Sequence, residues 1–250
     1  MTVTTEEELR ALQAIGRIVG LTIKRMSEHL APGITTAELD AVGAAVLAEH
    51  GARSAPMLAY NFPGHTCISI NDEAAHGIPS ERAIQPGDMV NIDVSAEKDG
   101  FWADSGASFA VPPVSEQKAG LIAGAKQALT IAMEAARAGQ PINAVGAAVQ
   151  RFAYRSGYHV IFELTGHGVG RHIHEEPHIP NIYDPRRKQP LTEGLVVTLE
   201  PFLTLGAQHI VTMPDGWTLC TEDGSLVAQF EHTVVITQGQ PLAVTAVPTN

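Results

Sequence analysis

The chain has 250 residues, 44% of them hydrophobic and 17% charged, which is enough apolar material for one large domain and argues against wholesale disorder. Its 16 Lys and Arg residues against 27 Asp and Glu residues give a formal charge of −11, and no basic run offers a nucleic-acid surface. Two cysteines are too few for a disulfide scaffold, and the acidic residues 1–8 are unlike a signal peptide. With no apolar stretch near the roughly 20 residues of a membrane helix, we expect a cytoplasmic protein outside the membrane.

The first predicted elements are two helices. Residues 5–8 have capping-box spacing, and apolar residues follow at steps of three and four, which predicts a helix ending near residues 32–33. A second capping box at residues 35–38 begins another helix, which ends at Gly51, where a C-cap glycine is expected.

A strand hairpin is predicted next. Apolar and polar residues alternate over residues 89–95, and residues 101–111 form the returning strand. A turn centred between Lys98 and its successor places Asp93 opposite Asp104.

The same plan of two helices returns later in the chain. A helix over about residues 115–138 is followed by a shorter one that closes at Gly157. The spacing of 18 residues from Gly33 to Gly51 recurs from Gly139 to Gly157. We interpret this as an internal duplication, with chance similarity between amphipathic helices as the alternative.

Strands follow the second helix pair, as they follow the first. An α+β fold in a single domain is therefore expected, with halves of about 1–112 and 113–250 and a site between them. The second-half strands are predicted around residues 159–164, 194–201, 209–213 and 228–236.

Four carboxylates interrupt these strand-like runs, although Asp and Glu are disfavoured in strands. They are Asp93, Asp104, Glu200 and Glu231. Each alone could be an exposed residue, but four in one cleft would repel unless protons or cations intervened. His167 lies among alternating glycines that would let a ligand approach its ring. Such a set suits two divalent ions, Mn, Fe or Co with Zn possible, which acidify a water for hydrolysis.

Two other motifs predict different chemistry and are set aside. Residues 174–178 match the His-Glu-x-x-His pattern of zinc proteases, but that motif needs a helix, which Pro177 interrupts. The glycines of residues 166–170 lack the spacing and the Lys-Ser/Thr pair of a phosphate loop.

Six motifs, in order and spacing, resemble the methionine aminopeptidases. They are residues 76–79, residues 90–93 with Asp104, and residues 166–171, 174–177, 198–201 and 228–233. The 26 positions from His174 to Glu200 leave no room for the helical insertion of type II enzymes, so the chain resembles a type I enzyme reduced to its catalytic domain. The resemblance implies the pita-bread fold, with an antiparallel sheet covered by helices.

The resemblance also implies roles for single residues. The five ligands of two metal ions would be Asp93, Asp104, His167, Glu200 and Glu231, with Asp104 and Glu231 as bridges. Glu200 would act as general base, His174 would hydrogen-bond the substrate carbonyl, and His76 would contact the scissile nitrogen. The alternatives are that His76 caps a turn and that His174 is an ordinary strand residue.

The implied substrate is the N-terminal methionine of new polypeptides with a small second residue. Phe62, Cys67 and Trp217, with His76 and His174, match the family's side-chain pocket, although each of the first three could be plain core. Ile173 stands where the family usually has Phe, and residues 58–62 depart from the usual Tyr-His-Gly-Phe. We expect a monomer and a possible contact with the ribosome.

Two other functions remain as alternatives. An Xaa-Pro aminopeptidase or prolidase shares the fold and ligands, but such enzymes usually have an extra N-terminal domain and an Arg where this chain has Gln229. A pita-bread binding protein without catalysis would have lost metal ligands, and all five matching positions are intact here.

Overall fold

Five helices lie within residues 1–247, the part of the chain that the computed structural model describes. The four predicted helices are present, and the first and third end earlier than expected. A short helix, α3, was not predicted. The bounds are α1 Glu6–His29, α2 Thr36–Glu49, α3 Ala55–Tyr60, α4 Glu116–Ala135 and α5 Ile142–Arg155.

The strands form four small antiparallel sheets. Their orders are β1-β4-β2 with β5 on β4, β13-β10-β6, β11-β12-β3, and β15-β14-β9-β7-β8. The first strands are β1 Arg53–Ser54, β2 Cys67–Ile70, β3 Glu73–Ala75, β4 Met89–Lys98 and β5 Phe101–Ala110. The others are β6 His159–Val160, β7 Thr165–Gly168, β8 Glu175–Pro180, β9 Val196–Leu199, β10 Phe202–Thr204, β11 Ile210–Thr212, β12 Leu219–Thr221, β13 Val227–Gln229, β14 His232–Val235 and β15 Leu242–Ala243.

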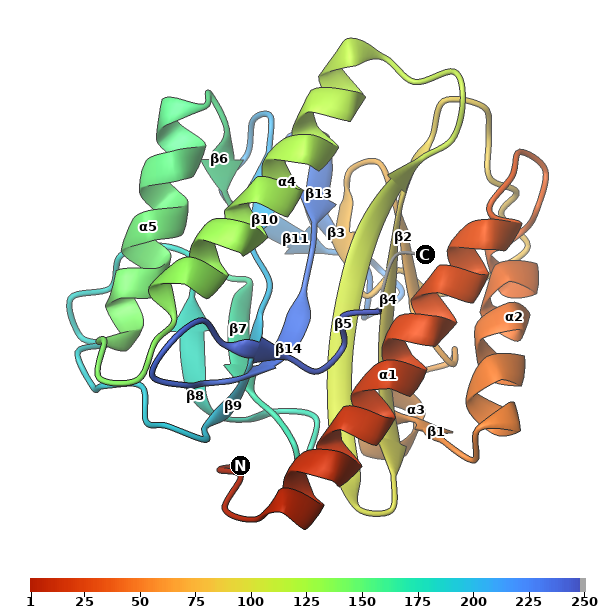
Figure 1. The fold of residues 1–250 in the computed structure, drawn as a ribbon. Helices are drawn as coiled ribbons and strands as arrows, with labels where there is room; N and C mark the ends of the chain where they lie inside the picture. The colour runs from red at the N-terminus through yellow and green to blue at the C-terminus, as the bar shows by residue number, and fades with distance from the viewer. Residues whose placement is uncertain (248–250) are drawn as a thin grey trace.

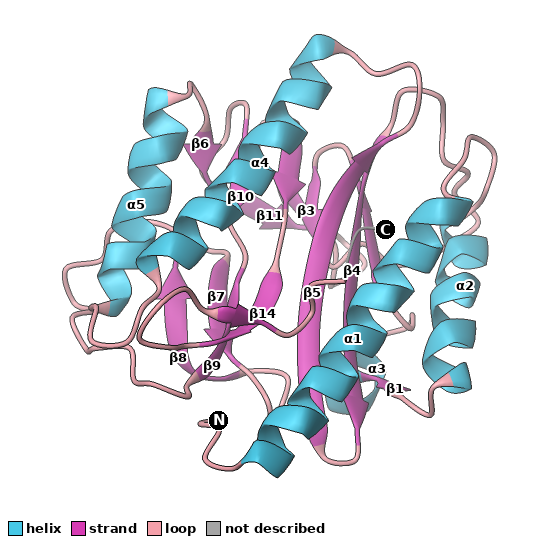
Figure 2. Ribbon diagram, viewed as in Figure 1, coloured by secondary structure: helices cyan, strands magenta, loops and turns pink. Residues whose placement is uncertain are grey.

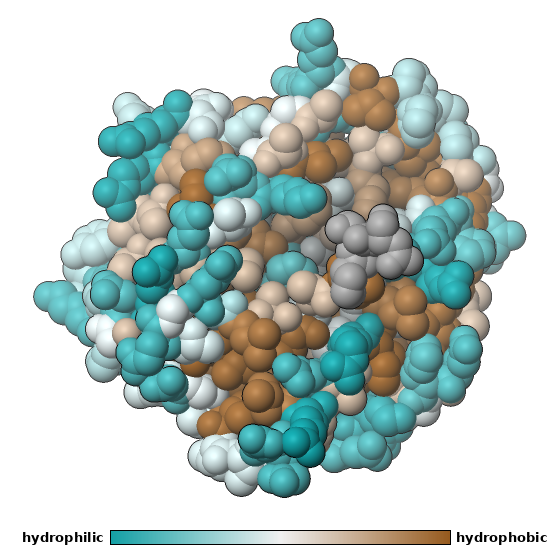
Figure 3. All heavy atoms as spheres, in the orientation of Figure 1, coloured by the Kyte–Doolittle hydropathy of each residue, from teal (hydrophilic) through white to brown (hydrophobic). Residues whose placement is uncertain are grey.

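The four longer helices, α1, α2, α4 and α5, cover one side of the strands. In Figure 1 the long strands β4 and β5 run through the middle, with α1 and α2 to one side and α4 and α5 to the other. Figure 2 shows α1 and α4 in front of the strands. In the space-filling view of this face, patches of hydrophobic residues lie among hydrophilic ones (Figure 3). The opposite side of the strands is left for the site.

Each helix pair packs over its own hydrophobic cluster. The first buries Leu12, Ile15 and Val19 of α1 against strand residues such as Ile92 of β4. The second packs α4 and α5 against β9, β10, β13 and β14. Two clusters of this kind are the packing expected for a repeated helix-pair plan, and the α+β class is as predicted.

The two predicted capping boxes differ in the structure. Thr35 and Glu38 form a complete box, in which the Glu38 carboxylate accepts from the Thr35 backbone N–H at 2.9 Å. Thr5 caps α1 through the N–H of Glu8, but the Glu8 carboxylate accepts from Thr4 instead. The first box is therefore only half formed. None of the helices in residues 1–247 has the length and hydrophobicity that crossing a membrane requires.

The predicted register of the β4–β5 hairpin is wrong by two positions. Asp93 lies opposite Gly106, and Asp104 lies opposite Ser95. Asp99 and Gly100 both have positive φ, 53° and 80°. A two-residue turn of this type needs positive φ at both central residues, which an Asp-Gly pair adopts readily. The turn is therefore centred one residue further along than predicted.

Candidate metal centre and active site

Five predicted ligand residues from both halves of the molecule line one cavity of about 210 Å³. They are Asp93 on β4, Asp104 on β5, His167 on β7, Glu200 directly after β9 and Glu231 between β13 and β14. Ligand atoms of Asp104, His167 and Glu231 all lie within 4.8 Å of one another. The fold thus gathers side chains that are up to 138 positions apart in the chain.

The His167 ring presents a bare nitrogen to the carboxylates. Its Nδ1 lies 2.9 Å from the carbonyl oxygen of Gly168, which can only accept, so Nδ1 carries the proton. Nε2 then has a free lone pair and lies 3.4 Å from Oε1 of Glu200 and 3.7 Å from Oδ2 of Asp104. A lone pair beside carboxylate oxygens is favourable when a cation lies between them.

Two buried oxygens of the cluster have no hydrogen-bond donor. Oδ1 of Asp104 and Oε1 of Glu231 accept no bond from any described residue. A buried acceptor without a partner costs free energy, and a bound cation would remove that cost. The four carboxylates and one imidazole therefore fit divalent metal ions of the harder, oxygen-preferring kind.

Electrostatics in the metal-free site support the same fit. Burial raises the pKa of Asp93 to about 7. Burial, and then repulsion from neighbouring carboxylates, raises the pKa values of Asp104, Glu200 and Glu231 well above their usual range. Burial lowers the pKa of His167 to about 3. Without cations, the site retains protons on its carboxyls and leaves the imidazole neutral.

Neighbouring polar side chains hold the second-half carboxylates in place. The Thr198 hydroxyl donates to Oε1 of Glu200 at 2.8 Å and accepts from the His167 backbone N–H at 3.0 Å. The Gln229 amide donates to Oε2 of Glu231 at 3.0 Å. Each bond engages one oxygen of its carboxylate, so it fixes the orientation of the Glu200 or Glu231 side chain.

Two further histidines, His76 and His174, line the same cavity. The His174 ring packs edge-on against His167, with ring centroids 4.3 Å apart. Burial among the surrounding groups, and then the neighbouring His76 and His178, lowers the pKa of His174 to about 4. His76 has a positive φ of 57°, unusual for a residue other than glycine. Both neutral rings can give or accept hydrogen bonds at the edge of the cluster.

A second cavity, of about 250 Å³, adjoins the first. His76, Asp93, Asp104 and His174 line both cavities. The remaining wall is mostly apolar and is made of Pro56, Tyr60, Phe62, Cys67, Ser95, Ile173 and Trp217. The rings of Phe62 and Trp217 meet edge to face, with centroids 5.2 Å apart. The structure therefore brings the three predicted pocket residues together beside the cluster.

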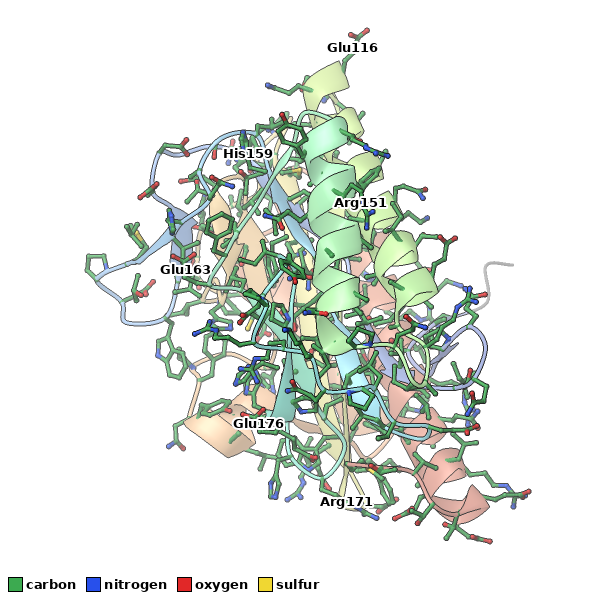
Figure 4. The ribbon with its side chains drawn as sticks, turned by 90° about the vertical axis from the view of Figure 1, so that its left-hand side faces the viewer. Glu116, Arg151, His159, Glu163, Arg171 and Glu176 are labelled. Atoms are coloured by element: carbon green, nitrogen blue, oxygen red, sulfur yellow. The ribbon has the colours of Figure 1, made fainter. Side chains whose placement is uncertain are left out.

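An outer groove of about 600 Å³ continues from the first cavity through Glu163, Thr165 and His178. In Figure 4 Glu163 lies to the left of α5, while α4 and α1 lie on the right. The site is therefore reached from the side of the strands away from α1, α4 and α5.

One local expectation, the placement of two carboxylates inside strands, needs correction. Glu200 and Glu231 are not inside strands: β9 ends at Leu199, and β13 and β14 are interrupted at Glu231. The interruption arises because the Glu231 N–H pairs with Gly106 of β5 instead of continuing its own sheet. His167 lies in strand β7. The His-Glu-x-x-His motif lies in extended chain around β8, so the zinc-protease interpretation stays excluded.

Sequence reasoning gave no role to Tyr60. Its hydroxyl lies 2.5 Å from Nδ1 of His174, across the mouth of the apolar cavity. A lone tyrosine at the end of a short helix carries no sequence signal, because the contact joins residues 114 positions apart. The motif of residues 198–201 includes Thr198 but does not indicate that its hydroxyl bonds Glu200.

A pita-bread frame that gathers four carboxylates and one imidazole in a single cavity is typical of metal-dependent hydrolases. The chain belongs to metallopeptidase family M24, whose model matches residues 10–238. The family resemblance of the sequence is thereby confirmed, and divalent metal use follows from the family and the cluster.

Similar proteins bear names from within this family. The chain is 48% identical over 247 residues to methionine aminopeptidase 2 of Bacillus subtilis, covering 98% of this chain and 99% of that one. The crystal structure of methionine aminopeptidase from Rickettsia prowazekii has a TM-score of 0.94 at 34% identity, covering 98% and 100% of the two chains. A prolidase from Pyrococcus furiosus has a TM-score of 0.78 at 23% identity, with 66% of that chain covered. This last likeness concerns the fold alone.

Proposed function

We propose that the protein is a type I methionyl aminopeptidase that removes the N-terminal methionine from new polypeptides with a small second residue. One observation carries the proposal: a cavity walled by aromatic rings and sulfur adjoins the cavity of the candidate metal ligands, and four residues, among them Asp93 and Asp104, line both. A thioether side chain in that cavity would place its own carbonyl carbon at the cluster. The names of relatives at 48% and 34% identity support the same activity.

In this proposal the cluster holds two divalent ions, Co, Mn or Fe with Zn possible. Asp93, Asp104, His167, Glu200 and Glu231 would be the ligands, and binding of the ions would satisfy the unpartnered oxygens of Asp104 and Glu231. When bound, the ions supply the positive charge that makes a water molecule acidic near neutral pH.

The chain's own residues then act on the peptide bond. Glu200 accepts the proton of the attacking water as general base. His174 donates a hydrogen bond to the carbonyl oxygen as negative charge develops on it, and His76 contacts the scissile nitrogen. Phe62, Cys67 and Trp217 enclose the methionine side chain. The expectations of a monomer, a ribosome contact and a cytoplasmic location stay predictions.

Gln229 argues against the prolidase-like alternative. Its buried amide donates to Glu231 and accepts a hydrogen bond from Asn91. An Arg at this position has no acceptor atom and could not replace the bond from Asn91. An inactive binding protein is disfavoured because the five ligand positions are intact and converge.

The test uses peptides that begin Met-Ala, Leu-Ala and Ala-Pro, with metal-stripped protein before and after addition of Co²⁺ or Mn²⁺. Metal-dependent release of methionine alone is expected. Cleavage before proline would favour the prolidase-like enzyme, and tight metal binding without any cleavage would overturn the proposed activity.

A further inference from the structure

Tyr60 and His174 line the apolar cavity together, although they come from distant parts of the chain. Tyr60 is the last residue of α3, in the first half, and His174 directly precedes β8, in the second half. The Tyr60 oxygen lies 2.5 Å from Nδ1 of His174, and the ring centroids are 5.5 Å apart. Among residues 1–247, His174 is the hydrogen-bond partner of the Tyr60 hydroxyl.

A bond at one ring nitrogen decides what the other nitrogen can do. A neutral imidazole has one N–H and one lone pair, so a donor at Nδ1 forces the proton onto Nε2, and an acceptor at Nδ1 does the reverse. His167 shows the second case, since its Nδ1–H donates to the Gly168 carbonyl and Nε2 therefore has no proton. His174 lies beside it but has a phenol, which can donate, as its Nδ1 partner.

We propose that the Tyr60 hydroxyl donates to Nδ1 of His174 and so holds the proton of that ring on Nε2. Tyr60 is then a positioning residue, which sets the tautomer and orientation of His174 without contributing an atom to the reaction. The two adjacent histidines are thereby given opposite properties: His167 offers a lone pair for a cation, and His174 offers an N–H for a developing oxyanion.

One observation and one chemical argument favour this direction for the bond. Burial raises the pKa of Tyr60, so its hydroxyl keeps the proton that it donates. The opposite direction would leave an Nε2 lone pair facing a substrate carbonyl oxygen, which is also an acceptor. This second argument rests on the proposed function, in which His174 meets that oxygen.

The first experiment reads the tautomer directly and needs no activity. The enzyme, labelled with ¹⁵N-histidine and loaded with diamagnetic Zn²⁺, is examined by NMR, and the His174 ring signals are assigned by their loss in His174→Ala. We expect a protonated Nε2 and an unprotonated Nδ1. Tyr60→Phe removes the hydroxyl alone and should introduce the other tautomer, whereas Tyr154→Phe, at a residue that is 84% exposed, should change nothing. A protonated Nδ1 in the wild type would overturn the proposal.

The second experiment is kinetic. Tyr60→Phe should lower kcat on a Met-Ala peptide about tenfold with little change in KM, because the lost interaction serves the transition state. Wild-type kcat in Tyr60→Phe would overturn the positioning role. His174→Ala separates the two proposals: normal turnover in that variant would refute the role of His174 in the proposed function, while the NMR result would still decide the tautomer.

Discussion

The two halves of the molecule place their candidate metal ligands in different ways. In the first half, Asp93 and Asp104 lie within the ten-residue strands β4 and β5, whose continuous pairing fixes where each carboxylate lies. In the second half the strands are short, and Glu200 and Glu231 lie where strands stop. A regular ladder and an interrupted one thus supply ligands to the same cluster, and the interrupted one needs side chains such as Thr198 to orient them.

The largest expected effect comes from removing one ligand charge in each half. Asp93→Asn and Glu231→Gln should each lower turnover of a Met-Ala peptide by about a thousandfold or more, because the amides are poor metal ligands. Both proteins should remain folded, since the shapes are conserved. Peptide release and metal content measure the effect, and near-normal activity in either variant would contradict the two-ion assignment.

A second prediction concerns the pH dependence of the metal-free protein. The pKa of Asp93 is about 7 in the folded state against 3.8 for an ordinary Asp, so the folded state binds more protons between these values, and stability falls as the pH rises from about 4 to about 7. Metal-free Asp93→Asn lacks this loss, so its stability relative to the wild type should increase over that window by roughly 2 to 4 kcal/mol.

Urea unfolding at several pH values measures this difference. Asp184→Asn is the matched control, because Asp184 lies outside the carboxylate cluster and its hydrogen bond from Arg186 lowers its pKa. Removing Asp184 should give no gain as the pH rises. A flat difference for Asp93→Asn would mean that its carboxyl is not the buried, proton-binding group described above.

The smallest effects distinguish the backbones of the two halves. A Cβ on Gly166 would lie 2.4 Å from the backbone oxygen of Thr198, which cannot move away without breaking the sheet, so Gly166→Ala should cost about 2 to 3 kcal/mol. A Cβ on Gly106 would meet the side-chain amide of Gln229 at 2.3 Å; this amide is buried and hydrogen-bonded, but a side chain can shift more readily than a backbone oxygen in a sheet. Gly106→Ala should cost less, about 1 kcal/mol, and should weaken metal binding about tenfold by displacing the amide from Glu231.

Thermal unfolding and metal titration of the two glycine variants test this contrast. Equal losses of stability with unchanged metal affinity in Gly106→Ala would show that Gln229 does not hold Glu231.

Much of the architecture could be predicted from local patterns. Helix periodicity and the box at Thr35 located the helices, because these signals lie within a few residues of one another. The hairpin register failed by two positions because alternation alone does not tell which of Lys98, Asp99 and Gly100 form the turn, whereas the positive φ angles do. The boundary between the halves stays a prediction.

The candidate site could likewise be predicted only in part. The five ligand residues could be named from motif order, and the structure brings them together, although their roles remain proposals. Tyr60 could not be found, because its contact with His174 depends on how α3 and the chain before β8 meet in space. Contacts across the cavity follow from the complete fold and leave no trace in neighbouring residues.

Because the ligands come from both halves, the cluster links metal supply to folding. Any ion that binds the folded state and not the unfolded chain adds RT ln(1 + [M]/Kd) to the free energy of unfolding. Each tenfold rise in free metal concentration above Kd therefore contributes about 1.4 kcal/mol for every ion bound. Metal limitation would then reduce total activity in two ways, by lowering the abundance of the folded protein and by lowering its rate of turnover.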